Sequence, residues 1–392
     1  IISTHIILFL TIISKIIKIN TIFPILTLLC FFSLQNYWEH HLISAFPIIG
    51  INFTILLISI RLFFSENKIT YYLSGVLFLV SCLIYELYIS FYPMYIILAF
   101  NRKTYFKRDF FYFSSIAALF TLSYFVFSSF SMGTYTGASI PDYNLNDIFE
   151  AVYIYSTSNI PGMMILKTKS TISQIMFGNI NYEINLNEYF DLIKIEWIVK
   201  ILLISTILFI TIDKLYTIHF SKRQLLILFA ISIFLIVLPN IPISLSGLHR
   251  GNALYRNATM YTGSYFSGYG YTLLFFLVLL IIISRKLFIL RYRIIILITL
   301  ILFFSIISLS VDISNHYVKR AQAGDMRLWK VVDKLLVNNY NYIENKKICA
   351  PSLWERGLRF GLFHPGTMDT YWNDYAKTKF NKIITFTKNN CN

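Results

Sequence analysis

Long apolar segments separated by short polar connections dominate the chain. The apolar segments form ten blocks: Ile1–Ile17, Ile22–Leu34, Leu42–Phe64, Tyr72–Ile89, Phe91–Phe100, Phe110–Phe130, Trp197–Ile212, Leu225–Ile241, Tyr265–Ile283 and Ile294–Val311. A bilayer core about 30 Å thick takes about 20 apolar residues per spanning helix, and a helix satisfies its own backbone hydrogen bonds there. The pattern therefore predicts an all-α integral membrane protein with about ten transmembrane helices.

The connections between the blocks alternate in charge, and this alternation predicts the orientation. The basic connections carry Lys15 and Lys18, Arg61 and Lys68, Arg102, Lys103, Lys107 and Arg108, Lys214, Lys222 and Arg223, and Arg285, Lys286, Arg291 and Arg293. Short loops rich in Lys and Arg stay in the cytoplasm. The other connections are then extracytoplasmic: 35–41, the long loop 131–196, 242–264 and everything after Asp312.

The apolar stretch from Tyr71 to Phe100 has basic residues at both ends. A single span would place these ends on opposite sides of the membrane and break the alternation. A hairpin of two short helices that turns between Glu86 and Pro93 keeps both ends cytoplasmic, and we prefer it.

Ile1 lies outside the cytoplasm in this topology, and the sequence does not begin with Met. Since inserted chains normally start from the cytoplasm, we expect an odd number of further spans upstream of Ile1.

Two domains are expected, a transmembrane domain over 1–311 and an extracytoplasmic tail over 312–392. Helical spacing predicts an amphipathic helix in the tail, on Leu328, Trp329, Val332, Leu335 and Leu336. The segments 347–350 and 382–387 are typical of short strands. The tail is therefore predicted to be a small α/β unit.

The composition agrees with a membrane location. The chain is 56% hydrophobic and 14% charged, whereas soluble domains have about a quarter of their residues charged. The net charge of +15 does not indicate a nucleic-acid partner, because the basic residues lie at the ends of apolar blocks. Cys30 and Cys82 are expected to be packing residues. Cys349 and Cys391 lie in the tail, where an oxidising compartment would permit a disulfide between them, and both the paired and the unpaired state stay open.

Glu86 is the most informative candidate residue, since it interrupts the apolar run before Pro93. A carboxylate inside such a run is costly and usually faces a partner or a cavity. Two interpretations stay open: a hydrogen-bonding group that pins the hairpin, and a group that lines a substrate cavity on the outer face.

A second candidate site is the predicted loop 249–257, with Arg250, Tyr255 and Arg256. Guanidinium groups bind phosphate oxygens bidentately, although Tyr and Arg also anchor helix ends at a membrane interface. His40 and the adjacent His41 follow Glu39, but adjacent histidines do not share a helix face, so we expect an interfacial turn and no metal site. Asp142, Asp147 and Glu150 are expected to be solvated, and the motifs of soluble enzymes are absent from the sequence.

Several of these segments resemble the GT-C class of membrane glycosyltransferases, which includes protein mannosyltransferases. The class commonly has a short-helix hairpin with a Ser-(Lys or Tyr)-Glu motif before Pro, here Ile84-Tyr85-Glu86 and Pro93. A later outer loop often carries an Arg-x-x-Tyr patch, here Arg250 to Arg256. The segment 30–47, with Trp38 and His40, loosely resembles an early outer loop of the class. The resemblance implies substrate-binding roles for Glu86, Arg250, Tyr255, Arg256 and His40.

This resemblance implies an enzyme of a bacterial inner membrane that transfers a sugar from a polyprenyl-phosphate-linked donor to a glycan, lipid or protein acceptor. Membrane lipids are the surrounding partners, no cofactor is assigned, and a requirement for a divalent cation stays open. The catalytic base of the class lies in the first outer loop, so we expect it upstream of Ile1. Two alternatives stay open: an O-antigen-type polysaccharide polymerase, and a flippase or transporter of lipid-linked glycans.

Overall fold

A computed structural model describes the helical parts of the chain and short pieces between them. The described residues are 2–17, 47–130, 144–157, 160, 195, 197–199, 201–203, 205–206, 221–256, 262–284, 294–295, 298–303, 305–309, 311–312, 332–338, 347–349, 373–374, 376–378, 380–381 and 385–387. The chain divides into two compact units. The first comprises Ile1–Leu166 and Asn187–Asn315, and the second comprises Lys167–Leu186 and His316–Asn392.

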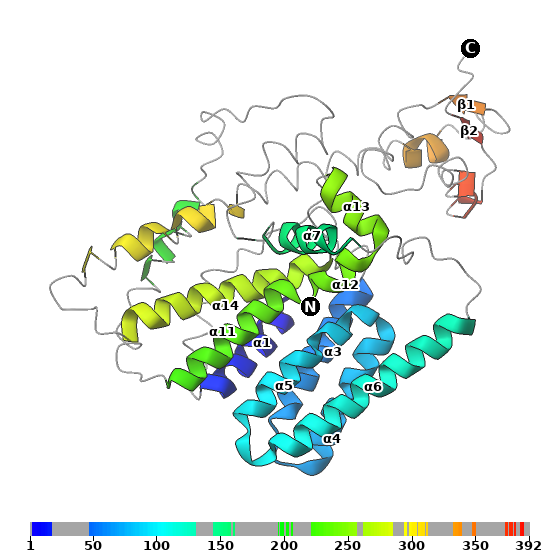
Figure 1. Cartoon of the computed structure of the whole chain (residues 1–392). Coiled ribbons are helices and arrows are strands. Elements are labelled where there is room, and N and C mark those ends of the chain that lie inside the picture. The colour runs from blue at the N-terminus through cyan, green and yellow to red at the C-terminus, as the bar shows by residue number, and fades with distance from the viewer. Residues whose placement is uncertain are drawn as a thin grey trace. The chain divides into compact units, whose positions relative to one another are not determined.

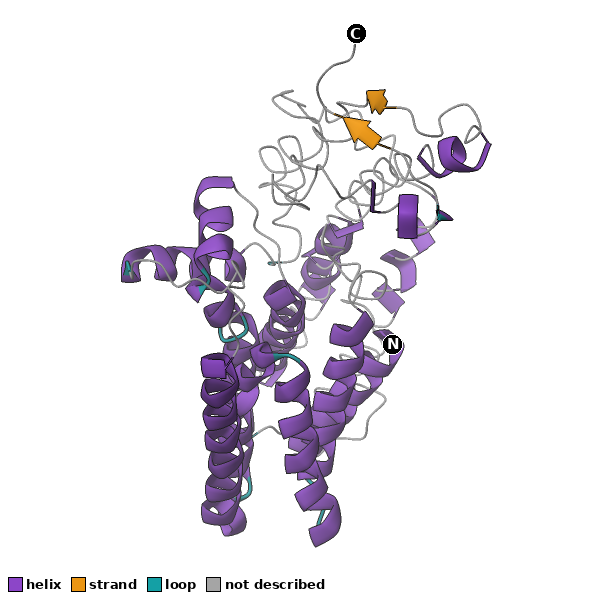
Figure 2. Cartoon of the chain, turned by 90° about the vertical axis from the view of Figure 1, so that its right-hand side faces the viewer, coloured by secondary structure: helices purple, strands orange, loops and turns teal. Residues whose placement is uncertain are grey.

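Every element described in the first unit is helical (Figures 1 and 2). The elements are α1 (Ile2–Ile17), α3 (Pro47–Phe63), α4 (Lys68–Ile84), η1 (Glu86–Phe91), α5 (Tyr92–Asn101), η2 (Lys103–Tyr105), α6 (Phe106–Phe130), α7 (Leu145–Thr157), α11 (Lys222–Val237), α12 (Asn240–Leu245), α13 (Gly247–Arg256) and α14 (Thr262–Ser284). The all-α class predicted for the apolar blocks is confirmed for these residues.

Capping side chains explain where two of the long helices begin. The Asn67 side chain accepts from the backbone N–H of Ile69 at 2.9 Å and starts α4. Ser221 and Gln224 form a reciprocal capping box at the start of α11. In both cases the side chain satisfies backbone donors that have no partner within the helix.

The long helices pack in two close pairs, α3 along α4 and α11 along α14, and α1 lies beside α3 (Figure 1). Helix α6 packs against α4 and α5. The close approach of α11 and α14 depends on Gly270, because a Cβ atom there would lie 2.7 Å from the carbonyl oxygen of Ser232. Cys82 is buried in this core with a free thiol, as expected for a packing residue.

The packing gathers one end of six helices into a surface that we call the basic end. It carries Lys15, Arg61, Lys68, Arg102, Lys107, Arg108, Lys222 and Arg223. Arg102 donates a hydrogen bond to the carbonyl oxygen of Phe63, and Arg223 donates to that of Phe100. Basic residues from connections far apart in the sequence therefore lie at the same end of the helices.

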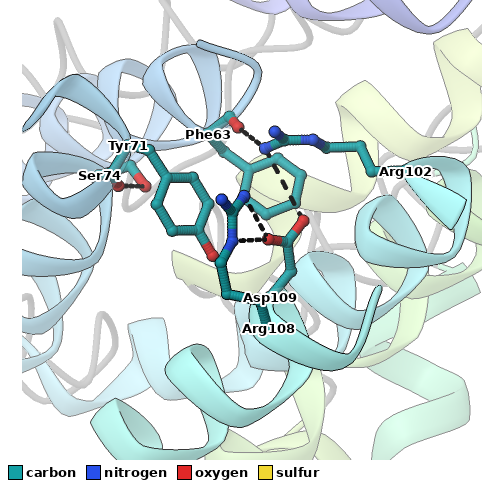
Figure 3. A network of polar contacts seen from close by, with 6 residues as sticks. All are labelled: Phe63, Tyr71, Ser74, Arg102, Arg108 and Asp109. Atoms are coloured by element: carbon teal, nitrogen blue, oxygen red, sulfur yellow. Dashed lines mark hydrogen bonds and ion pairs between the residues drawn. The ribbon is translucent and has the colours of Figure 1, made fainter. Parts of the chain in front are cut away.

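A buried carboxylate organises the basic end (Figure 3). Asp109 is fully buried, and its Oδ1 atom accepts from Nε and Nη2 of Arg108 at 3.1 and 2.9 Å. Its Oδ2 atom lies 3.7 Å from Nη1 of Arg102. The Arg108 guanidinium also lies 4.1 Å from the centroid of the Tyr71 ring, close enough for a cation–π interaction. One network thus joins α4, α5 and α6.

The predicted hairpin between Tyr71 and Phe100 is confirmed. Helix α4 ends at Ile84, Tyr85 is extended, and α5 returns the chain to the basic end. The Arg102 guanidinium, just after α5, lies 5.5 Å from the ring centroid of Tyr71 in the first turn of α4. The two ends of the hairpin therefore meet.

Two described helical runs are long and apolar enough to cross a membrane by length and composition. They are Phe106–Val126, and Lys222–Leu245, which comprises α11, α12 and the turn between them. The other apolar runs in the described part of the chain are 10–17 residues long, and one of them, Tyr265–Val278, lies inside α14.

The second unit is described only in short pieces. Strand β1 (Lys347–Cys349) pairs in parallel with β2 (Thr385–Thr387), and Ile348 lies opposite Phe386. Both strands fall within the segments predicted as strands. Residues 332–338 are helical, with Val332 and Leu336 buried at i and i+4, as the amphipathic pattern predicts.

Candidate functional site

The turn of the hairpin presents Glu86 at the end of the first unit opposite the basic end. Tyr85 leaves the helical conformation (φ −153°, ψ 116°), and the 3₁₀ helix η1 begins at Glu86. Residues three apart eclipse one another in a 3₁₀ helix. Tyr88 and Phe91 accordingly share the buried face of η1, while Glu86 is exposed.

Aromatic rings hold η1 in place. The ring centroids of Tyr88 and Phe91 lie 5.7 and 5.0 Å from that of Phe266 on α14. Phe266 in turn lies 4.9 Å from Phe53 on α3, and these contacts are edge-on. Edge-to-face rings at such distances are favourable, so η1 rests on a well-packed support from two other helices.

Glu86 itself forms no hydrogen bond or ion pair with another described residue, and it is exposed. This geometry contradicts the interpretation that Glu86 pins the hairpin by a hydrogen bond within the described region. The support comes from Tyr88 and Phe91, and the carboxylate is left able to accept hydrogen bonds from a ligand.

Three short helices, α7, α12 and α13, contact one another at the same end, and α12 also contacts η1 (Figure 1). The Tyr155 hydroxyl on α7 donates to the carbonyl oxygen of His249 on α13 at 2.7 Å. Asn240, at the start of α12, donates to Ser267 Oγ on α14 at 3.1 Å and to Ser156 Oγ at 3.3 Å. The bonds to His249 and Ser156 join the short helices to one another, and the bond to Ser267 fastens them to α14.

The segment around Arg250 is helical, so the prediction of a loop at 249–257 is wrong for residues 249–256. The sequence predicts a loop here because the segment contains no long apolar run. In the structure Ala253 and Arg250, one turn apart, are both buried. A helix of ten residues with one narrow packed face leaves too weak an apolar signal to be recognised from the sequence.

The predicted site residues are only partly brought together. Arg250 lies on α13 and Glu86 on η1, and both elements contact α12, but no hydrogen bond or ion pair joins the two side chains. Tyr255 and Arg256 occupy the last turn of α13, with side chains outside the described set. His40 and Cys391 also lie outside the described residues. The backbone of Cys349 is described, but its side chain is outside the described set.

Burial affects the histidine of this layer. His249 is half-buried on α13, and the cost of burying a charged imidazole lowers the pKa of His249 below its usual value. The ring is therefore neutral at pH 7, so the cationic side chain described on α13 is that of Arg250. The exposed carboxylate of η1 and the buried guanidinium of α13, on two elements that both contact α12, can serve hydroxyl and phosphate recognition respectively.

A polar network that the sequence analysis missed lies beneath η1. His5 on α1 is fully buried, with Nε2 at 2.8 Å from the carbonyl oxygen of Gly50 and Nδ1 at 2.8 Å from the Tyr265 hydroxyl. The Tyr265 and Tyr269 hydroxyls are 2.8 Å apart. An ionisable residue inside an apolar block is itself a signal, and it could have singled out His5.

Among the described residues, no group of three His, Cys, Asp or Glu side chains could hold a metal ion. No family model matches the chain, and no curated protein or solved structure is significantly similar to it.

Proposed function

We propose that the chain is a multi-pass membrane protein of about ten spans, whose basic end faces the cytoplasm and whose η1 end and α/β tail are extracytoplasmic. Large apolar side chains exposed on the outer faces of the helices support this. Leu122 and Phe125 on α6 are 65% and 67% exposed, and Leu226 on α11 is 67% exposed. Soluble proteins seldom expose contiguous apolar surfaces of this kind, whereas lipid covers them without cost.

We infer that the protein transfers a sugar from a polyprenyl-phosphate donor to a glycan, lipid or protein acceptor at the η1 end. The observation that carries this proposal is Glu86, exposed in the turn of a short-helix hairpin that continues into Pro93. The same arrangement is the basis of the resemblance to GT-C glycosyltransferases. The extracytoplasmic position of the turn follows from the proposed orientation of the basic end.

The proposed roles follow from the chemistry of the side chains. Glu86 accepts hydrogen bonds from hydroxyl groups of the sugar or acceptor. Arg250 and Arg256 stabilise the phosphate, which gains charge as the bond from the anomeric carbon to the phosphate oxygen breaks. The acceptor oxygen forms the new bond to that carbon, and its proton passes to a general base.

The test is sugar transfer in membranes that contain the full chain, with polyprenyl-phosphate mannose and polyprenyl-phosphate glucose as the donor probes. Glu86→Gln and Arg256→Ala are expected to abolish transfer while the protein stays inserted. Glu150→Gln is the matched control, because Glu150 on α7 is also an exposed carboxylate and has no proposed role in binding. Full activity in both variants would falsify the proposal. A product of altered chain length, with transfer intact, would instead favour the polymerase alternative.

A further inference from the structure

An open cavity lies at the basic end, between the last turns of α1 and α3 and the connection from α3 to α4. Its volume is about 560 Å³. The cavity is lined by Lys15, Arg61, Leu62, Phe64, Ser65, Glu66 and Thr70. It belongs entirely to the first unit and is distant in the fold from η1, since α3 and α4 run between the two ends.

The two cations of this cavity differ from the arginines of the Figure 3 network. Arg102 and Arg108 share the carboxylate of Asp109, whereas Lys15 and Arg61 form no ion pair within the described part of the chain. Lys15 is exposed and Arg61 is half-buried. Both charges are therefore available to a ligand that enters the cavity.

Hydroxyl groups add neutral donors to the same cavity. The Ser65 Oγ atom accepts from the backbone N–H of Asn67 at 3.2 Å, which leaves its proton to donate. The Thr70 hydroxyl has no hydrogen-bond partner in the described region. Glu66 is the one carboxylate in the lining, so the formal charge of the cavity is positive by one unit.

We propose that this cavity binds a phosphate group, and that the phosphate is the headgroup of an anionic membrane phospholipid. A guanidinium, an ammonium and two hydroxyls together suit the oxygens of a phosphate. Glu66 favours a phosphodiester with one negative charge over free phosphate with nearly two, because like charges repel more strongly as the charge rises.

The remaining lining residues suit a lipid as the source of the phosphate. Leu62 and Phe64 give the cavity an apolar wall beside its cations. Basic pockets between helices on the cytoplasmic side of membrane proteins are typical sites for lipid headgroups. The phosphate chemistry stands on the cavity alone, whereas the lipid source rests on the membrane location proposed above.

The experiment is native mass spectrometry of the delipidated full chain in detergent, titrated with phosphatidylglycerol, phosphatidylcholine or inorganic phosphate. The double variant Lys15→Gln, Arg61→Gln is expected to bind phosphatidylglycerol at least about tenfold more weakly, since it loses both charge-assisted donors. The double variant Lys107→Gln, Lys222→Gln is the matched control. It removes the same charge from exposed lysines of the basic end that do not line the cavity, and its affinity should change less than about twofold.

A third variant distinguishes a loss of the binding site from a loss of the folded protein. Thr70→Val keeps every charge and removes only one hydroxyl, and it should weaken binding about threefold. Unchanged affinity in the Lys15→Gln, Arg61→Gln variant, or an equal loss in the lysine control, would overturn the site. Displacement of phosphatidylglycerol by equimolar inorganic phosphate would overturn the lipid source. None of these readouts measures sugar transfer, so failure here is distinguishable from failure of the proposed activity.

Discussion

The Nδ1 atom of His5 lies 2.8 Å from the hydroxyl oxygen of Tyr265, while its Nε2 atom lies 2.8 Å from the carbonyl oxygen of Gly50. A carbonyl can only accept, so Nε2 carries a proton and donates to Gly50, while Nδ1 and the Tyr265 hydroxyl share the other hydrogen bond. The ring thus bridges α1, α3 and α14. Both contacts lie beside the support of η1, because the ring centroid of Tyr265 lies 5.7 Å from that of Phe53.

Replacing His5 with Leu should lower the free energy of unfolding by about 1–3 kcal/mol, because buried polar groups on two neighbouring helices lose their partner. The measurement is the thermal unfolding midpoint in detergent. Ser14→Ala is the control on the same helix, since the Ser14 hydroxyl donates only to the carbonyl oxygen of Thr11. A His5→Leu midpoint no lower than that of Ser14→Ala would show that the bridge does not stabilise the bundle.

Asp109 should be the most sensitive residue of the basic end. Asp109→Ala leaves Arg102 and Arg108 facing each other without a counter-charge, and breaking a buried ion pair costs about 3–5 kcal/mol. Arg108→Ala should cost less than about 2 kcal/mol, because Arg102 still neutralises the carboxylate and the Arg108 side chain is 37% exposed. Chemical denaturation of the two variants in the same detergent gives the comparison. Equal losses would contradict the central place of Asp109.

The hairpin could be predicted from the sequence because basic residues at both ends of one apolar stretch indicate that both ends lie on the same side of the membrane. The helices α3, α5, α6 and α14 likewise coincide with apolar blocks to within a few residues, apart from the start of α3 at Pro47. In each case the signal is local, since a run of apolar residues of sufficient length specifies a helix wherever it packs.

The architecture of the η1 end could not be predicted in the same way. Helix α7 lies inside the segment predicted as a long loop, and it forms through contacts such as the bond from Tyr155 to His249, 94 residues apart. The burial of Arg250 and the exposure of Glu86 depend equally on packing between distant segments. Short helices gain most of their stability from tertiary contacts, which a local pattern does not encode.

Glycine positions should distinguish two kinds of helix contact. In Gly270→Ala the new methyl group meets backbone atoms of α11, Ser232 O at 2.7 Å and Ile236 N at 3.0 Å, so the helices must separate. We expect a loss of about 1–3 kcal/mol in the free energy of unfolding. In Gly75→Ala the three atoms nearest to the new methyl group belong to the side chains of Tyr112 and Ile116, which can move more easily than backbone, so the cost should be smaller. Thermal unfolding of both variants tests the order, and the reverse order would contradict it.

The free energy of unfolding should depend on pH in part through the titration of His249. Burial lowers its pKa in the folded protein, while in the unfolded chain it titrates near the usual value of about 6.5. Below this value the unfolded state binds more protons than the folded state, so stability falls as the pH decreases towards the folded pKa; above it, His249 adds no pH dependence.

The matched variant is His249→Asn, which keeps the backbone carbonyl that accepts from Tyr155. Unfolding midpoints measured at pH 7, 6 and 5 should fall less steeply in His249→Asn than in the wild type, because one proton-linked group has been removed. All other titrating groups are common to the two proteins, so the difference between the curves isolates His249. Parallel curves would mean that this imidazole titrates alike in both states, and that the contact of α13 with α7 leaves it accessible to water.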